Sequence, residues 1–425
     1  MDKTAVRIID VFDTVDEFVF SILMMTLPFG WQFSIIPLLL FGVLMFRKAL
    51  KERITPSKEK VIYFLPVFAY FLIMLISLVY SKHPGRGLDL LVQKSSFLAI
   101  PLLLLFTAFS RRVARKGFRF FVLGTLLVSL LYIVTGLYRS TQIGDGMLCI
   151  VPGFSSDKTY LLDTVIHNNY LMGDNFSFLM HPTYTAVLLA FSISIVVFTL
   201  INEHKSLLIQ RIAIPVFIVE SFVLILLSTN GALMSAVVLS VILIFLTIRY
   251  RHYLDLKKYW LILVAMILLS GVAYNPQFQV LSGRTSGSDE NTMRLKAREI
   301  TLDVIKEHPF LGVGNGDLYH MLAQKYEDSG LDEMKELRIN PHNQYLHTWA
   351  ETGIPGLLTL LWILGTLIWF GFKRRNFLMI TFALLFGISM NFESMMNRYW
   401  GIMMMAIFYS LFYFHSEPDP EEEDR

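Results

Sequence analysis

One polar stretch of this sequence has the residue types and spacing to do chemistry. Residues 338–358 read RINPHNQYLHTWAETGIPGLL and place His342 and His347 among amide, hydroxyl and carboxyl side chains, just before an apolar segment. A histidine can take a proton from a hydroxyl group at neutral pH, or orient that group by a hydrogen bond. His342 is therefore a candidate general base. The plainer alternative is a histidine at a helix start whose polar atoms are satisfied by the backbone.

The residues around His342 predict how it is positioned. Proline disfavours helical geometry in the residue before it and is well suited to a first helical turn, so we expect a helix to begin at Pro341. On that helix His342 and Tyr345 would share a face. The Gly-Ile-Pro-Gly sequence at 353–356 is expected to break this helix and restart it into the membrane.

The composition indicates a polytopic membrane protein. Of 425 residues, 54% are hydrophobic and only 17% are charged, whereas soluble proteins carry about 25% charged residues. The net charge of +3 is too small to argue for a nucleic-acid partner. A single cysteine, Cys149, excludes an intramolecular disulfide and a cysteine metal site, and we see no other metal-binding pattern.

Apolar runs that can cross a bilayer recur about twelve times, so we predict an all-α polytopic membrane protein with about 12 transmembrane helices. Basic residues cluster after the even-numbered spans, for example at 47–60, 111–116 and 373–375. The positive-inside rule then makes those connections and both termini cytoplasmic. The expected spans are Phe18–Pro28, Phe33–Phe46, Val61–Tyr80, Leu91–Phe109, Phe118–Tyr138, Thr183–Ile201, Ile212–Leu227, Ala232–Ile248, Tyr259–Tyr274, Leu357–Phe372, Phe377–Met390 and Tyr399–Phe414.

This topology divides the chain into four parts. Residues 1–274 hold spans one to nine and an outer loop at 139–182. Residues 275–352 form a large, helical outer loop between spans nine and ten. Residues 353–414 hold the last three spans, and 415–425 form an acidic cytoplasmic tail.

Two arginines in the large outer loop are candidates for binding an anion. Arg294 and Arg298 lie four residues apart on an expected helix at 292–308, so both can face one direction. Two guanidinium groups at the membrane surface suit a diphosphate, which arginine binds bidentately. The alternative is a solvated helix face on which they pair with Glu299 or Asp303.

A second outer turn adds further candidates. Glu393 and Arg398 lie between the last two expected spans, and one interpretation is that they pair with each other. In the other interpretation, Arg398 binds an anionic ligand and Glu393 contacts the arginines or the histidine. We count both as candidate substrate-binding residues. The same class includes Arg298, Asn343, Tyr345 and His181.

The order of these motifs resembles the O-antigen ligase family of membrane glycosyltransferases. An arginine helix is followed by Pro-x-x-Gly-x-Gly-x-Gly at 309–316, then by Pro341-His342-Asn343, and after nine intervening residues by Gly-x-x-Gly at 353–356. The His-Asn and Gly-x-x-Gly spacing is the family signature. O-antigen polymerases and protein O-oligosaccharyltransferases look similar.

The resemblance implies a metal-independent, inverting glycosyltransferase without a cofactor, in the bacterial inner membrane. It would transfer a glycan from a polyprenyl (undecaprenyl) diphosphate donor to an acceptor hydroxyl, such as lipid A–core, at the periplasmic face, in lipopolysaccharide or polysaccharide biosynthesis. His342 matches the family's essential histidine and Arg294 the arginine of the outer-loop helix. One departure is Ser228-Thr229-Asn230, where the family carries a Ser-Arg pair; Arg398, Arg298 or Arg139 would have to supply that charge.

Two alternatives stay open. A polymerase of the same superfamily would use the same donor and differ only in its acceptor. A non-catalytic polysaccharide transporter would need charged residues near the middle of the membrane. Glu220 is the main residue of that kind in the expected spans.

Overall fold

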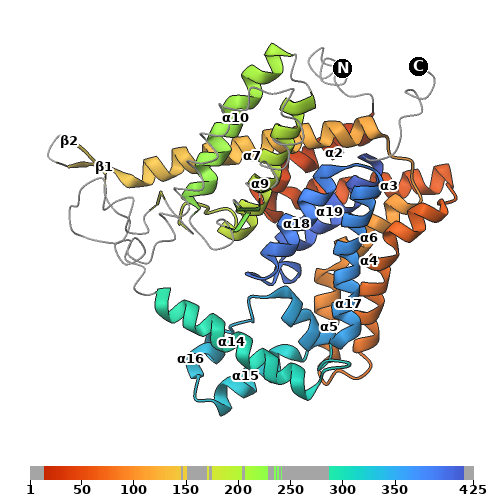
Figure 1. Ribbon diagram of the computed structural model, residues 1–425, viewed down its shortest axis with the longest axis vertical. Helices are drawn as coiled ribbons and strands as arrows, with labels where there is room; N and C mark the ends of the chain where they lie inside the picture. The colour runs from red at the N-terminus through yellow and green to blue at the C-terminus, as the bar shows by residue number, and fades with distance from the viewer. Residues whose placement is uncertain are drawn as a thin grey trace.

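The structure is a computed structural model that describes residues 14–144, 147–150, 170–171, 175–202, 206–227, 234–235, 237–238, 241 and 287–415. Within these ranges the chain is almost entirely helical (Figure 1). The exception is one antiparallel hairpin, β1 (Thr141–Gly144) and β2 (Met147–Ile150), in which Thr141 pairs with Ile150. The predicted helical fold is therefore confirmed apart from this hairpin.

The helices form one bundle and a separate small layer. The elements are α2 (Val15–Thr26), η1 (Leu27–Phe29), α3 (Trp31–Glu52), α4 (Lys58–Ser77), α5 (Pro84–Gln93), α6 (Ser95–Leu105), α7 (Arg111–Ser140), α9 (Pro182–Asn202), α10 (Leu207–Leu226), α14 (Gly287–Glu307), α15 (Leu318–Asp328), α16 (Asp332–Glu336), α17 (Gln344–Lys373), α18 (Phe377–Ser389), η4 (Met395–Asn397) and α19 (Tyr399–His415).

The bundle is held by one apolar core. Helix α2 packs on α3 and α7, α17 on α4 and α18, and α19 on α6 and α7. Helix α19 is buried along nearly its whole length, and its Phe408 ring packs against Phe382 of α18 with ring centroids 5.1 Å apart. Burial of this much apolar and aromatic surface is what fixes the neighbours of each helix.

The spans that the structure supports are fewer than expected. Among the described residues, six helices (α3, α4, α7, α9, α10 and α17) are long and apolar enough to cross a membrane, or seven if a bent pair counts as one span. That pair is α5 and α6, bent by 50° where we expected a continuous Leu91–Phe109 span. Helices α2 and α18 are only 12 and 13 residues long, so the expected Phe18–Pro28 and Phe377–Met390 spans are short. Tyr259–Tyr274 and most of Ala232–Ile248 lie outside the described residues, and the count of twelve is not confirmed.

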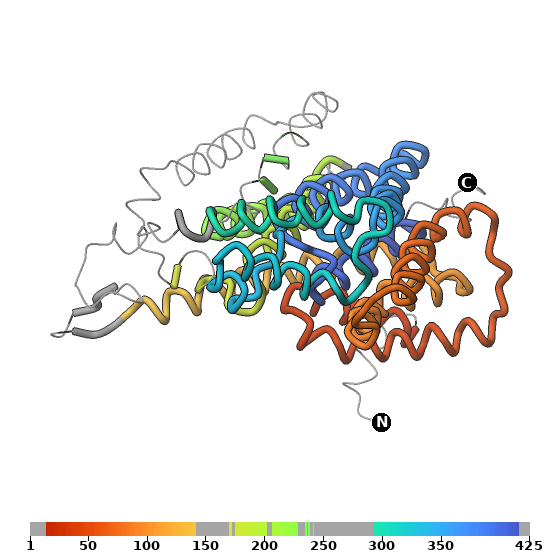
Figure 2. Tube along the Cα trace, turned by 90° about the horizontal axis from the view of Figure 1, so that it is seen from below, coloured from red at the N-terminus to blue at the C-terminus, as the bar shows by residue number. Residues whose placement is uncertain are grey.

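Helices α14, α15 and α16 form the separate layer at one end of the bundle (Figures 1 and 2). They have a core of their own, built from residues such as Val304, Leu322 and Tyr326. The first turns of α17 complete this core through Ala350 and Trp349. Helix α17 therefore belongs to both parts, and its start is fixed relative to the layer.

A glycine-rich loop joins this layer to α17. The backbone N–H groups of Val313 and Gly314 donate to the carbonyls of Ala350 and Glu351, both at 2.9 Å. Gly353 has φ 68° and ψ −164°, a conformation that essentially only glycine adopts, and it breaks α17 at this contact. The predicted break at 353–356 is confirmed at its first residue.

The same loop also docks on the turn between α4 and α5. The buried Asn315 donates from its side chain to the Gly87 carbonyl at 2.9 Å, and its N–H donates to Ser77 Oγ at 3.1 Å. Asp317 accepts hydrogen bonds from the backbone N–H groups of Lys82 and His83. The Pro-x-x-Gly-x-Gly-x-Gly motif is thus a joint between the layer and the bundle.

Candidate functional site

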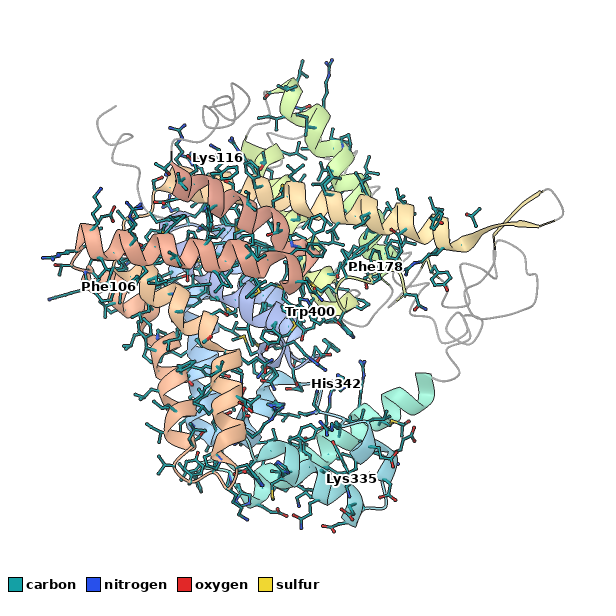
Figure 3. All side chains as sticks on the ribbon, turned by 180° about the vertical axis from the view of Figure 1, so that it is seen from behind. Phe106, Lys116, Phe178, Lys335, His342 and Trp400 are labelled. Carbon is teal, nitrogen blue, oxygen red and sulfur yellow. The ribbon has the colours of Figure 1, made fainter. Side chains whose placement is uncertain are left out.

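His342 lies in a tight turn just before α17, where the layer meets the bundle (Figure 3). The His342 N–H donates to Asn340 Oδ1 at 2.7 Å, and His342 has φ 43°. Asn343 caps α17, since its Oδ1 accepts from the Leu346 N–H at 3.0 Å. The predicted helix start at Pro341 is wrong, because these two asparagine side chains hold residues 340–343 in a turn. His342 therefore does not share a helical face with Tyr345.

The His342 ring contacts a buried carboxylate. Its Nδ1 lies 3.2 Å from Glu393 Oε2, and the two side chains are 19% and 7% exposed. A carboxylate at this distance favours the tautomer with the proton on Nδ1, which leaves the lone pair on Nε2. This arrangement of a carboxylate behind an imidazole is suited to proton abstraction by Nε2.

The environment keeps Glu393 ionised. Burial alone would raise the pKa of Glu393, but the hydrogen bond and the charge of His342 outweigh it, with further help from His181 and the Ser394 N–H. The pKa of Glu393 is therefore lowered from its usual value. Glu393 therefore pairs with the histidine and not with Arg398, which was the other interpretation of this turn. His181, at the start of α9, is close enough to act on the same carboxylate.

Arg298 fixes the histidine turn from the layer side. Its guanidinium donates through Nε to the Pro341 carbonyl at 3.4 Å, and through one Nη to the carbonyls of His342 and Asn391 at 3.2 and 2.8 Å. One side chain thus joins α14, the 340–343 turn and the turn after α18. Charged donors make the stronger class of hydrogen bond, and the planar guanidinium fits several acceptors at once.

Arg294 lies one turn before Arg298 on the same helix. Burial lowers the pKa of Arg298, and the charge of Arg294 lowers it further. Asp303, which we considered as a neutralising partner, pairs instead with Lys306 at 2.7 Å. The two arginines are thus close enough to interact on α14, and Arg298 carries its charge to the turn of His342.

Further polar contacts lock the turn after α18 onto the start of α17. Buried Gln344 accepts from the Met396 N–H at 2.7 Å, and Ser394 Oγ lies 3.3 Å from Asn340 Oδ1. His347 Nε2 contacts the Asn397 side chain. Sequence reasoning missed Gln344 and Asn340, although an asparagine two residues before the histidine is a typical signal for such a turn.

A buried ion pair lies deeper along α17. Lys94 Nζ is 3.8 Å from Glu351 Oε2, and their side chains are 1% and 4% exposed. Lys94 is at the bend between α5 and α6, so the pair ties the broken span to α17 near its glycine break. Charges this deeply buried need a partner, and removing one of them costs about 3–5 kcal/mol.

The other candidate residues are placed as follows. The Tyr345 hydroxyl donates to the Gly387 carbonyl of α18 at 2.7 Å. Arg398 is exposed in the turn before α19. Residues 228–230, where the family arginine was expected, lie outside the described residues. Arg139, one of the suggested substitutes, stacks over Phe178, with its guanidinium carbon 5.0 Å from the ring centroid.

Comparison with known proteins finds a family similarity in the segment that carries the site. The family model described as O-antigen ligase matches residues 215–361, which include Arg294, Arg298, the glycine-rich loop and His342. Over this segment the chain is similar to the O-antigen ligase family. An uncharacterized protein of Haemophilus influenzae is also similar, being 26% identical over 377 residues that cover 84% of each chain.

The similarity to the O-antigen ligase family indicates a role in glycan transfer at a membrane. The membrane-spanning helices agree with this role. The matched segment is also the part that assembles the His342 turn: it contributes α14, the glycine-rich loop and the first half of α17. The turn that carries Glu393 and the nearby His181 come from outside it.

Proposed function

We propose that this protein transfers a glycan from a polyprenyl-diphosphate donor to an acceptor hydroxyl, as an O-antigen ligase does. The observation that carries the proposal is the contact between His342 and the buried Glu393, beside the two arginines of α14. Such a transfer needs a base that takes the proton of the acceptor hydroxyl and, in the same site, a group that binds the diphosphate.

The reaction can be written with these residues in named roles. The acceptor hydroxyl gives its proton to His342 Nε2, while Glu393 stabilises the imidazolium that forms. The acceptor oxygen forms a bond to C1 of the donor sugar as the bond from C1 to the diphosphate oxygen breaks. Attack from the face opposite the leaving group inverts C1. The polyprenyl diphosphate leaves with its electron pair and added negative charge.

Arg294 is proposed to receive that charge. It lies in the segment that matches the family and is next to Arg298 on α14. Fixed guanidinium groups stabilise a diphosphate leaving group because they are charged at any working pH and bind two oxygens at once. In this proposal no metal or other cofactor takes part.

Arg298 is proposed mainly to position the base. Three backbone carbonyls, two of them in the turn of His342, share its Nε and one Nη. Its charge still adds to the potential that attracts the diphosphate. We propose Asn343, Tyr345, Arg398 and His181 as further substrate-binding or site-forming residues.

We further propose that the site faces the periplasm from the bacterial inner membrane. Basic residues lie at the far end of α17, around Lys373, whereas the layer and His342 lie at its start. Basic connections favour the cytoplasmic side, so the start of α17 would be periplasmic, in a loop of residues 275–352, with both termini inside. Lipid A–core or another surface glycan would be the acceptor.

A deletion strain tests the proposed ligase against the alternative polymerase. Loss of a ligase leaves lipid A–core uncapped while long polymer accumulates on the polyprenyl carrier. Loss of a polymerase instead leaves single repeat units on the acceptor. Complementation with wild type and with His342→Ala shows whether the phenotype depends on the proposed site. A strain that showed neither change would contradict glycan transfer and favour the non-catalytic transporter.

A further inference from the structure

A second site lies at the opposite end of α17 from His342. A cavity of about 360 Å³ opens there between the start of α7, the end of α9, the connection from α17 to α18 and the end of α19. After the break at Gly353, helix α17 continues to Lys373, and these 20 residues alone span roughly 30 Å at 1.5 Å per residue. This cavity is therefore separate from the proposed catalytic site.

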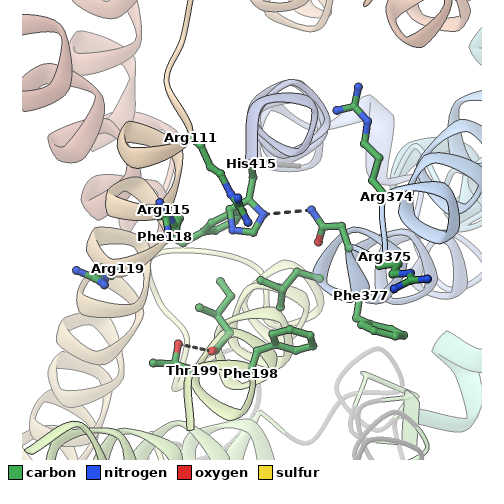
Figure 4. A pocket seen from close by; sticks show the side chains of 13 residues that line it. Arg111, Arg115, Phe118, Arg119, Phe198, Thr199, Arg374, Arg375, Phe377 and His415 are labelled. Carbon is green, nitrogen blue, oxygen red and sulfur yellow. Dashed lines mark hydrogen bonds between the residues drawn. The ribbon is translucent and has the colours of Figure 1, made fainter. Parts of the chain in front are cut away.

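The rim of the cavity is strongly basic. Five arginines line it: Arg111, Arg115, Arg119, Arg374 and Arg375. None of the described residues that line it is acidic, and of the five arginines Arg374 pairs with Glu59 of α4 at 3.4 Å. Figure 4 shows Arg111 and Arg115 beside the ring of His415, with Arg374 on the opposite side. Such a rim favours an anion, and guanidinium groups fit phosphate oxygens in particular.

Neutral donors add to the arginines. The Asn376 side-chain amide lies 3.1 Å from His415 Nδ1. Because the amide nitrogen is a donor, Nδ1 accepts and His415 carries its proton on Nε2. A residue that lines the cavity thus keeps an N–H group that can donate to an oxygen of a bound anion.

The floor of the cavity is apolar. Phe118, Ile195, Phe198, Phe377 and Leu378 line its inner part. A soluble phosphate would use the rim and leave this floor empty. A molecule with a phosphate group and an acyl chain would use both, since the chain buries apolar surface against the floor.

We propose that this cavity binds an anionic phospholipid, with the headgroup phosphate among the arginines and an acyl chain against the apolar floor. The site lies at the basic end of the spans, where such headgroups are found on the cytoplasmic side. The inference does not depend on the proposed glycan transfer.

One competing occupant is the acidic end of this chain. His415 lines the cavity, and the sequence continues with six acidic residues in SEPDPEEEDR. That segment has charge complementarity to the rim but contains no large apolar side chain to cover the floor. The observations therefore favour a lipid, and the segment becomes an outcome of the test.

The test is a titration of the purified full-length protein in zwitterionic detergent with phosphatidylglycerol, while the midpoint of thermal unfolding is followed. We expect phosphatidylglycerol to raise the midpoint, and phosphatidylcholine or sodium phosphate at the same concentration to leave it unchanged. Arg115→Gln/Arg119→Gln should need roughly 30-fold more lipid, at about 1 kcal/mol for each arginine. The matched control Arg47→Gln/Arg112→Gln removes two exposed charges outside the cavity and should titrate as wild type.

Three results would overturn the proposal. An equal rise with sodium phosphate would show a site for soluble anions. A Thr199→Trp variant, which fills the cavity and keeps every arginine, should lose the lipid effect, and unchanged titration would exclude the floor from binding. The third result concerns a protein that lacks residues 416–425. If this deletion lowers the midpoint of thermal unfolding in the absence of lipid, and if wild type and Arg115→Gln/Arg119→Gln then need the same amount of lipid, the acidic segment is the occupant.

Discussion

His342 Nδ1 lies 3.2 Å from Glu393 Oε2, although 51 residues separate them in the sequence. The contact joins the turn before α17 to the turn after α18. Because Nδ1 faces Glu393, the other ring nitrogen of His342, Nε2, points away from this carboxylate. The predicted consequences of this contact, and of the residues that hold it, can be measured one at a time.

Glu393→Gln should lower glycan transfer by about 10- to 100-fold, because the amide keeps the size of the side chain but no longer stabilises the imidazolium. The expected signature is a fall in kcat with a nearly unchanged KM for the donor. Steady-state transfer rates of the purified variant measure this. A rise in KM alone would mean that Glu393 contacts substrate rather than the base.

The lowered pKa of Glu393 predicts a pH-dependent contribution to stability. The carboxyl keeps its charge in the folded protein at pH values where the unfolded chain, with a usual value of 4.5, is already protonated. Its contribution is therefore present above about pH 4.5 and is lost as the pH falls through the lower folded value.

The difference in thermal midpoint between wild type and Glu393→Gln should thus shrink as the pH is lowered from about 5 to below the usual carboxyl value of 4.5. The control is Glu299→Gln on the exposed face of α14. A wild-type advantage that stayed constant over this range would refute the assignment of the shift to Glu393.

Arg298→Lys should slow transfer although it keeps the charge. A lysine ammonium cannot reproduce the planar fork that serves the carbonyls of Pro341, His342 and Asn391, so the turn loses its support. We expect a loss of about 1.5–3 kcal/mol in stability and a lower kcat. Lys296→Ala, on the exposed side of the same helix, is the control. Selective weakening of donor binding, with kcat intact, would instead assign Arg298 to the diphosphate.

Gly353→Ala should destabilise the joint between the layer and the bundle. A Cβ at Gly353 would collide with the Phe310 carbonyl oxygen, and its φ of 68° is unfavourable for alanine. The backbone strain alone costs about 1–3 kcal/mol. Gly365→Ala, in the same helix with open space around it, should be neutral or stabilising. Equal thermal midpoints for the two variants would show that the glycine is not needed for this contact.

Hydropathy and spacing predicted the broad arrangement because both depend on local sequence. Apolar runs located most of the helices, and the glycine-rich motifs marked the break in α17. The bend between α5 and α6 was missed. The bend lies at Lys94, which forms a buried ion pair with Glu351. Because these two residues are far apart in the sequence, no local pattern predicts the bend.

The partners within the site were only partly predictable. From the sequence, pairing with Arg398 was the commoner expectation for Glu393 and contact with the arginines or the histidine was the alternative; three-dimensional packing selected His342. The start of α17 was misplaced because Pro341 and Asn343 are both good helix-start residues, and the asparagine cap prevailed. Glu220, considered as a sign of transport, is buried and accepts hydrogen bonds from Thr125 and Ser192, at 2.6 and 2.9 Å.

The most direct test of the account is glycan transfer by the purified protein in a bilayer. The reaction would contain a polyprenyl-diphosphate glycan, lipid A–core and a metal chelator, and would compare wild type with His342→Ala, Arg294→Ala and the exposed-histidine control His308→Ala. We predict transfer by wild type and His308→Ala, and a loss of about 10²-fold or more in the other two. Near wild-type transfer by correctly inserted His342→Ala and Arg294→Ala would contradict the proposed site, and donor units joined to one another would show a polymerase instead.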